Sequence, residues 1–84
     1  MFFTYILYSR STERYYIGST DNLIRRFHEH SGDQEKATKG RGPWIMVYWA
    51  SFSSHKEALA KERYLKSGAG YRWRIKHIEF PAPD

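Results

Sequence analysis

The first twenty residues contain two short runs of apolar and aromatic side chains, and this pattern constrains the fold more than any other. The runs are residues 2–9 and 15–19, and a polar segment of five residues separates them. Short runs rich in branched and aromatic side chains with a polar stretch between them predict a β-hairpin. Because neighbouring strand residues point to opposite faces, Tyr5 should share one face with Leu7 and Ser9.

Two further elements follow the hairpin. Thr20 or Asp21 can cap a helix that runs to about Ser31. Residues 33–43 are polar, basic and rich in glycine, and we expect a mobile loop there. Residues 44–52 are apolar enough to predict a third strand that is central in the sheet or buried on both faces.

The last part of the chain has the pattern of two helices. Ser54 and Glu57 form a capping box that opens a helix to about Lys66. After a break at residues 67–70, a short helix is expected over residues 71–79. The order β-β-α-β-α-α predicts an α+β fold with a small three-stranded, mostly antiparallel sheet flanked by helices.

Chain length and composition restrict the classes of protein that this sequence can form. With 84 residues, 18% of them aromatic, the chain can close one core, and we expect one domain over residues 1–84. The absence of cysteine excludes disulfides, thiolate metal ligands and cysteine nucleophiles. No apolar run approaches membrane-spanning length and no signal peptide is visible, which favours a cytoplasmic protein with no membrane partner.

The charge is positive and unevenly distributed. The net charge is +5, and the whole excess follows residue 35, where ten basic residues stand against four acidic ones and are interleaved with Trp and Tyr. This pattern favours a nucleic-acid partner, with an ordinary solvated face as the alternative. The candidate phosphate contacts are Lys36, Lys39, Arg41, Lys61, Arg63, Lys66, Arg72, Arg74 and Lys76.

The first predicted helix places two basic side chains beside an apolar stripe. Leu23, Ile24 and Phe27 form a stripe about 100° wide on a helical projection. Arg26 and His30 are four residues apart at the edge of this stripe and point the same way, where the wall of a cleft would lie. The alternative is that both are boundary residues that extend to water.

The second predicted helix carries a carboxylate on its apolar face. Glu62 falls between Ala58 and Leu59 on the helical projection, in the middle of an apolar face that also includes Leu65. A carboxylate in this position must be protonated, paired or bound to a cation, because an unpaired buried charge costs several kcal/mol. Glu62 is therefore either a functional residue or half of a salt bridge with Arg26 or another basic residue.

Several separated elements together resemble the GIY-YIG nuclease superfamily. Tyr16-Ile17-Gly18 is followed at the family's spacing by Arg26 and His30, and Phe3-Thr4-Tyr5 stands in the place of the first family triplet. Residues 41–48 and 57–66 are similar to the third strand and second helix of small stand-alone bacterial members. Phe3 and Thr4 depart from the triplet, and the only asparagine, Asn22, is far from the position of an asparagine that some members use.

The resemblance implies an endonuclease that hydrolyses DNA phosphodiester bonds with one divalent cation, Mg²⁺ or Mn²⁺, in DNA repair or processing. Glu62 would be the sole protein ligand of the metal. Tyr5 would take a proton from the attacking water with help from His30, Tyr16 would hold the water or the phosphate, and Arg26 would neutralise transition-state charge. A tyrosine with an ordinary pKa is a poor base at neutral pH, so cationic neighbours are expected to lower the pKa of Tyr5.

Two other functions remain open at this point. A catalytically silent DNA-binding module on the same scaffold is expected if Glu62 is paired to Arg26 with no room for a metal. A protein-interaction adaptor is expected if Trp44, Trp49 and Trp73 form one exposed patch. Because no part of the chain resembles a recognition helix, a protein partner could supply the specificity of a nuclease.

Overall fold

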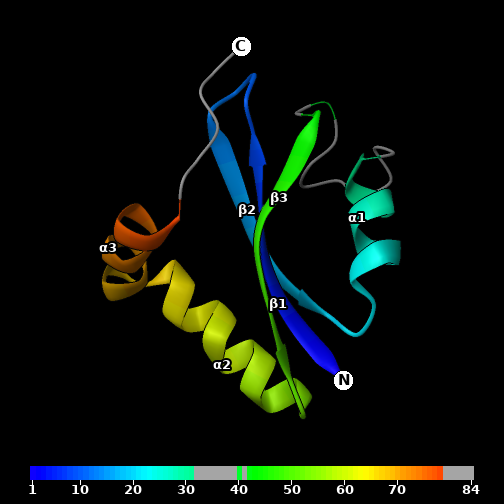
Figure 1. The fold of residues 1–84 in the computed structure, drawn as a ribbon, viewed down its shortest axis with the longest axis vertical. Coiled ribbons are helices and arrows are strands. Elements are labelled where there is room, and N and C mark those ends of the chain that lie inside the picture. Colours follow the sequence, from blue (N-terminus) through cyan, green and yellow to red (C-terminus); the bar gives the residue numbers. More distant parts are fainter. Residues whose placement is uncertain (32–39, 41, 79–84) are drawn as a thin grey trace.

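A computed structural model describes residues 1–31, 40 and 42–78 of the chain and shows a three-stranded antiparallel sheet with three helices. The predicted α+β class and the order β-β-α-β-α-α are confirmed (Figure 1). The elements are β1 (Phe2–Ser9), β2 (Arg14–Thr20), α1 (Leu23–Ser31), β3 (Trp44–Phe52), α2 (His55–Lys66) and α3 (Gly68–His77). The predicted mobile loop lies mostly outside the described residues. None of the helices in the described ranges is long and apolar enough to cross a membrane.

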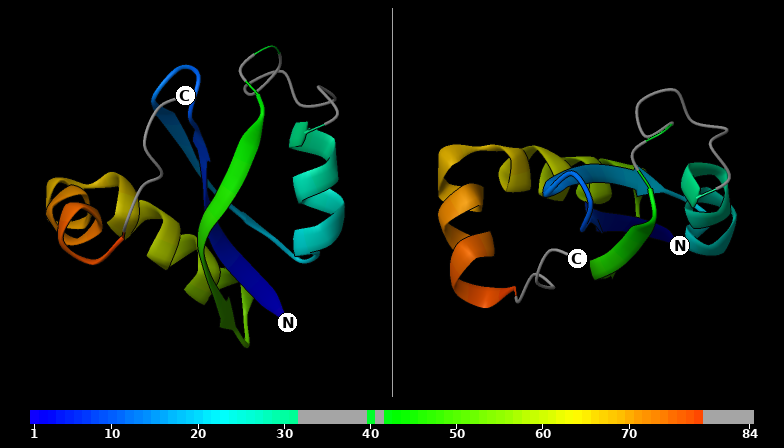
Figure 2. Two further views of the ribbon diagram at one scale, coloured as in Figure 1. Left: turned by 45° about the horizontal axis from the view of Figure 1, so that its top comes forward. Right: turned by 90° about the horizontal axis from the view of Figure 1, so that it is seen from above.

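Helices cover both faces of the sheet, as the views in Figures 1 and 2 show. On one face, Tyr5 and Leu7 of β1 form a buried cluster that packs against Phe27 of α1. On the other face, Ile6 of β1 packs against Leu65 of α2. The alternation of strand side chains therefore separates two small cores, one on each face.

The central strand is β1, and residues 44–52 form a strand as predicted, but the alternative that this strand is central is wrong. The strand order is β2-β1-β3, so β3 is an edge strand. Residues 4–9 of β1 are all buried, whereas Trp49 of β3 is 56% exposed. The apolar run in β3 has another cause, because Met46 packs toward α1 and Val47 packs toward α2. A strand with helices on both faces needs apolar residues on both faces wherever it lies in the sheet.

The unusual first triplet has a structural role. The Thr4 hydroxyl is buried and donates a hydrogen bond of 2.6 Å to the carbonyl of Ala58, which ties α2 to β1. The Phe3 ring lies edge-on to Trp49, with 6.2 Å between the ring centroids. These two departures from the family triplet therefore serve packing.

The N-terminal caps of α1 and α2 differ from the prediction in one case. Neither Thr20 nor Asp21 caps α1, because the side-chain oxygen of Asn22 accepts the backbone N–H of Arg25 at 3.0 Å. The Thr20 hydroxyl instead accepts the N–H of Asn22 and fixes the turn before the helix. The Ser54 cap of α2 is confirmed, since its hydroxyl accepts the N–H of Glu57 at 3.2 Å.

The last helix begins at Gly68, three residues earlier than predicted. The Ser67 hydroxyl accepts the N–H of Gly70 at 3.2 Å, so the expected break is in fact the N-cap and first turn of α3. Gly70 is buried against the end of α2, and a Cβ added there would overlap the backbone of Tyr64 and Leu65. Gly70 therefore allows the two helices to meet at a sharp corner.

Replacement of Gly70 by alanine is expected to lower the free energy of unfolding by about 2 kcal/mol or more, because the backbone of α2 cannot move away without loss of packing. Urea unfolding followed by circular dichroism measures this loss. Gly68→Ala is the matched control, since a Cβ there meets only the end of the Arg72 side chain at 3.8 Å and alanine favours helix. Equal stability of the two variants would contradict the close contact of α2 and α3.

Candidate active site

The candidate site surrounds Gly18 on the edge strand β2. Gly18 lies opposite Tyr5 of β1 in an unbroken antiparallel register, so there is no bulge here. A Cβ added at Gly18 would lie 2.6 Å from the Tyr5 hydroxyl, and it would lie 3.1 Å from the Tyr16 ring. The side chain of Tyr5 therefore occupies the space beside Gly18.

Tyr5, Tyr16 and His30 meet on the α1 face of the sheet. The Tyr5 hydroxyl and His30 Nε2 are 3.0 Å apart and hydrogen-bonded, and the Tyr16 ring centroid is 4.7 Å from that of His30. His30 has no exposed surface, although the helical projection placed it at the edge of the apolar stripe. Ile24, predicted within the stripe, is 73% exposed. The helix is thus rotated about its axis so that His30 faces the sheet in place of Ile24.

Burial controls the acidity of Tyr5. Burial raises the pKa of Tyr5 to about 12, and a hydrogen bond and the positive charge from Arg26 oppose this without overcoming it. Arg26 therefore lowers the pKa of Tyr5 as expected, but burial outweighs this effect and the net shift is upward. Tyr5 is a neutral hydroxyl at physiological pH, and its partner His30 is the nearest group that can accept its proton.

Arg26 lies between the tyrosines and a carboxylate. Its guanidinium is 3.0 Å from the carboxylate of Glu29, and both side chains are about one-quarter to one-third exposed. Glu29 lies three residues after Arg26 on α1 and turns toward it. This ion pair keeps the guanidinium beside Tyr5 and leaves part of its surface open to a ligand.

Glu62 is held by two partners on the other face of the sheet. The Ser19 hydroxyl donates a hydrogen bond of 2.7 Å to one carboxylate oxygen, and Lys66 Nζ is 2.8 Å from the other. Burial alone would raise the pKa of Glu62, and the hydrogen bonds from Lys66 and Ser19 outweigh this effect, so the pKa lies below its ordinary value. Glu62 is therefore a carboxylate at neutral pH, and its salt bridge is with Lys66 and not with Arg26.

The two halves of the site meet around the edge of β2. Tyr5 and Gly18 belong to the α1 face, and Ser19 belongs to the α2 face. The negative charge of Glu62 contributes to the raised pKa of Tyr5, so the field of the carboxylate reaches across the strand. A polar cleft of about 500 Å³ lies at the end of β2, and its lining includes Ser19 and Arg26. The cleft therefore reaches one residue of each half, Arg26 on the α1 face and Ser19 on the α2 face.

The donor set at Glu62 fits a single hard cation. A carboxylate with a neighbouring serine hydroxyl offers the oxygen donors that Mg²⁺ and Mn²⁺ prefer, and Lys66 shows that the position already attracts positive charge. In the described ranges, no group of three or more His, Asp or Glu side chains could enclose a metal ion. A metal here would rely on water and a substrate phosphate for its remaining ligands.

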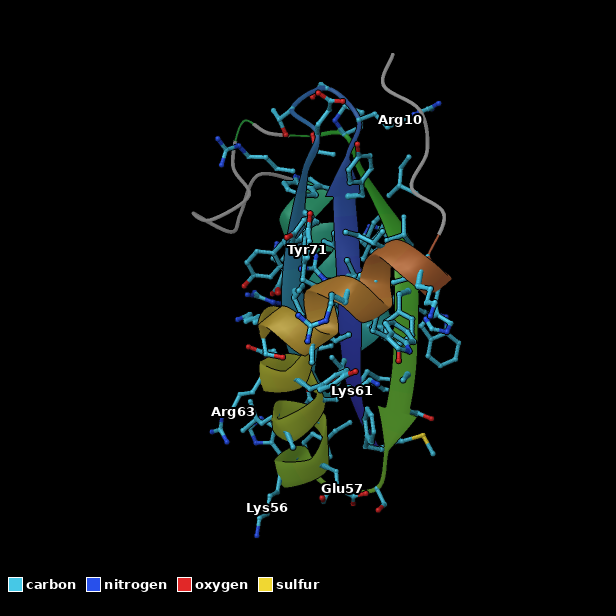
Figure 3. The ribbon with its side chains drawn as sticks, turned by 90° about the vertical axis from the view of Figure 1, so that its left-hand side faces the viewer. Arg10, Lys56, Glu57, Lys61, Arg63 and Tyr71 are labelled. Atoms are coloured by element: carbon cyan, nitrogen blue, oxygen red, sulfur yellow. The ribbon has the colours of Figure 1, made fainter. Side chains whose placement is uncertain are left out.

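The residues predicted to contact phosphate differ in their exposure and in their contacts. Lys36, Lys39 and Arg41 lie outside the described residues. Arg74 is only 4% exposed, and its guanidinium hydrogen-bonds to the Tyr15 hydroxyl at 2.9 Å, so it is a packing residue in this structure. Lys61 and Arg63 project from α2 (Figure 3). The exposed members in the described part of the chain are Arg63, Lys66, Arg72 and Lys76.

The three tryptophans do not form one exposed patch. Trp44 is buried in the core on the α1 face, at 6% exposure. Trp73 is partly buried on the opposite face, edge-on to Tyr48 and with Lys61 Nζ 4.9 Å above its ring. Only Trp49 is exposed. The adaptor interpretation therefore loses the feature on which it depended.

Ser19 is the site residue that the sequence did not reveal. Its partner Glu62 is 43 positions away, and only the packing of α2 on β2 brings the two together. One signal could have indicated Ser19. It lies on the same face of β2 as Ile17, and Ile17 packs in one cluster with Leu65, which follows Glu62 by three residues. Without knowledge of which helix covers that face, Ser19 could be assigned only to the end of a strand.

Comparisons with known proteins agree with this geometry. Residues 1–72 match the family model of the GIY-YIG catalytic domain. The chain is 40% identical over 67 residues to a UPF0213 protein of Clostridium perfringens. The matched region covers 79% of this chain and 71% of that protein. It is 35% identical over 79 residues to a UPF0213 protein of Oceanobacillus iheyensis, covering 93% and 90% of the two chains.

Two further similarities concern a nuclease and a solved structure. The chain is 41% identical over 51 residues to the structure-specific endonuclease subunit SLX1 of Homo sapiens, covering 56% of this chain and 18% of SLX1. The solution NMR structure of a UPF0213 protein from Bacillus halodurans has a TM-score of 0.54 and 32% sequence identity, covering 90% of this chain and 84% of that chain. The similarity to the bacterial protein thus extends over nearly the whole fold.

The raised pKa of Tyr5 predicts a specific dependence of stability on pH. The unfolded chain ionises this tyrosine near pH 10, whereas the folded protein keeps it protonated until about pH 12. Its contribution is therefore fully present below about pH 10 and is lost as the pH rises to about 12. Urea unfolding at a series of pH values should show a smaller decline over this range in Tyr5→Phe than in the natural protein. Equal slopes in both proteins would show that Tyr5 is not the group responsible.

Proposed function

Because the chain belongs to the GIY-YIG family, we propose that it is a divalent-metal-dependent endonuclease that hydrolyses DNA phosphodiester bonds. The observation that carries this proposal is the convergence of a tyrosine–histidine pair, a half-buried arginine and a hydrogen-bonded carboxylate around the edge of one strand. A module that only binds DNA requires none of these groups at this spacing. The SLX1 relative, which is named an endonuclease subunit, supports the same activity.

The Tyr5–His30 pair supplies a path for the proton of the attacking water. In the neutral tautomer with a free Nε2, His30 accepts the hydrogen bond from the Tyr5 hydroxyl. As Tyr5 takes a proton from water, it passes its own proton to Nε2, so the tyrosine never needs to ionise. A pKa of about 12 is compatible with this relay, since the histidine is the final acceptor.

Arg26 and Tyr16 bind and orient the phosphate. The guanidinium of Arg26 is preorganised by Glu29, which lowers the cost of placing it against a phosphate oxygen. Tyr16 is partly exposed beside His30, where its hydroxyl can hold the water or the phosphate. Positive charge fixed at the place where negative charge develops is a main source of catalysis in phosphoryl transfer.

Glu62 would hold the metal, and Ser19 would orient the carboxylate. A bound divalent cation supplies Lewis-acid stabilisation of phosphate and leaving-group oxygens. For Glu62 to accept the cation, Lys66 has to move away from the carboxylate oxygen that it now contacts at 2.8 Å. Its exposed side chain is free to turn toward solvent or toward the substrate, because it is 53% exposed.

We also propose that the protein acts in DNA repair or processing and that a protein partner supplies its specificity. The relative SLX1 is named a structure-specific endonuclease subunit, which agrees with cleavage guided by DNA shape. The basic surface offers phosphate contacts, which position DNA without reading its sequence. A pair of Glu62 with Arg26 would have favoured the alternative of a silent DNA-binding module, and the described ion pairs are instead Glu62 with Lys66 and Arg26 with Glu29.

The first test of the activity is cleavage of labelled linear, flapped and branched DNA with Mg²⁺ or Mn²⁺. Glu62→Gln should abolish metal-dependent cleavage, because the neutral amide keeps the shape of the side chain and loses its charge. Arg26→Ala should reduce the rate by about 10²–10³. Tyr5→Phe should also remove activity, because it interrupts the proton path to His30.

Glu57→Gln is the control for this experiment, since Glu57 is a carboxylate on the same helix that lies in the cap with Ser54. It should cleave as well as the natural protein. Circular dichroism of every variant confirms that the fold is intact. Cleavage that persists in Glu62→Gln, or no cleavage of any substrate by the natural protein, would leave DNA binding as the leading function.

Metal affinity should respond to the two side chains that contact Glu62. Ser19→Ala should weaken Mn²⁺ binding by about 10–100-fold, as loss of an outer-shell partner does at other metal sites. Lys66→Met should strengthen binding, because it removes a competing cation while it keeps the side-chain stem. Calorimetric titration in the absence of DNA measures both effects. No change in either variant would argue that the metal binds elsewhere.

A further inference from the structure

We propose that Tyr15 and Tyr71 form a stacking subsite for an unpaired base of the DNA strand, close to Glu62. The inference rests on the proposed function and specifies its substrate as DNA with a single-stranded segment. The subsite comprises Tyr15 of β2 and Tyr71 and Ile75 of α3. It is separate from the tyrosines of the proton path, since Tyr15 and Tyr16 point to opposite faces of the sheet.

Exposure distinguishes these side chains from the other aromatic residues of the fold. Tyr15 is 42% exposed, Tyr71 is 51% exposed and Ile75 is 61% exposed. Together with Tyr8 and Glu13, they line an open, largely apolar hollow of about 210 Å³. Exposed aromatic rings beside a hollow offer π-faces to any base, and stacking of this kind tolerates all sequences.

A buried arginine holds the subsite in shape. The Arg74 guanidinium carbon is 3.9 Å from the centroid of the Tyr15 ring and 5.4 Å from that of Tyr71. The same guanidinium donates a hydrogen bond of 2.9 Å to the Tyr15 hydroxyl. These contacts fix the two rings before a ligand arrives, which reduces the entropy lost on binding. Arg74 was predicted to contact phosphate. In this proposal it instead positions the two tyrosine rings on which the base would stack.

The position of the subsite matches the path of a strand that leaves the catalytic centre. Tyr15 and Ser19 lie on the same face of β2, four residues apart, which corresponds to about 13 Å along the strand. This separation equals about four nucleotides of a stacked strand. The Ser19 hydroxyl binds Glu62, so a phosphate at the proposed metal would have its neighbours within reach of Tyr15.

Positive charge surrounds the Glu62 end of this path. Lys66 lies one helical turn beyond Glu62, at the end of α2 from which α3 continues toward Tyr71. Arg63 is close enough to Glu62 to lower its pKa. In Figure 3, Arg63 projects from α2 on the side of β2, and Tyr71 lies over β2. Proteins that bind single strands generally combine aromatic rings, which stack on the bases, with cations that contact the phosphates.

Fluorescence anisotropy with a labelled oligothymidylate, and with a duplex of the same length, tests the subsite without metal, so that no cleavage occurs. Tyr71→Ala should weaken binding of the single strand by about 5–100-fold and leave duplex binding nearly unchanged. Tyr71→Phe keeps the ring and should bind normally. Tyr71→Leu keeps an apolar side chain without a π-face and should bind as weakly as Tyr71→Ala.

Tyr64→Ala is the matched control, because Tyr64 is 40% exposed on α2 and its ring lies under Lys61, outside the subsite. It should bind both probes normally. Equal binding by Tyr71→Ala and the natural protein, or equal losses on single strand and duplex, would overturn the subsite. Normal binding by Tyr71→Leu would also overturn it and point to an apolar protein segment as the ligand.

The result also separates the subsite from the nuclease activity. If Tyr71→Ala loses single-strand binding and no DNA is cut by the natural protein with metal, the subsite stands and the proposed activity falls. The opposite result is that the natural protein cuts DNA and that Tyr71→Ala binds and cuts the single strand as well as the natural protein does. The activity then stands and the subsite falls.

Discussion

The contact between Tyr5 and Gly18 is the constraint on which the site depends. The central strand has to place a large phenol against the edge strand, and only a residue without a side chain leaves room for its hydroxyl. That placement directs the hydroxyl toward His30, which draws α1 onto the sheet and brings Arg26 beside the same tyrosine. One glycine therefore positions groups from two strands and a helix.

The opposite face of the sheet is built by a different connection. The Thr4 hydroxyl holds the start of α2, and Leu65 packs on Ile6 and Ile17 farther along, so the helix is attached at both ends of its contact with the sheet. Glu62 lies between these attachments and meets Ser19. A carboxylate that looked misplaced on an apolar helix face is thus set beside the thin edge strand, where its field reaches Tyr5.

Patterns of local origin were predictable from the sequence, and long-range ones were not. The hairpin, the Ser54 cap and the anomalous position of Glu62 depend on neighbours within a few residues, and each could be predicted. The central position of β1, the burial of His30 and the fate of Arg74 depend on how the helices pack. The spacing of Tyr16, Arg26 and His30 allowed the catalytic cluster to be proposed, whereas Ser19 became visible only when α2 was placed on β2.

The ion pair of Glu62 with Lys66 has a consequence for the protein when no ligand is bound. A tethered ammonium serves as an internal counter-ion, so the carboxylate keeps its charge balanced and its orientation in the absence of metal. Under the proposed function, a substrate phosphate would draw the same ammonium away from the carboxylate and leave that oxygen open to the metal.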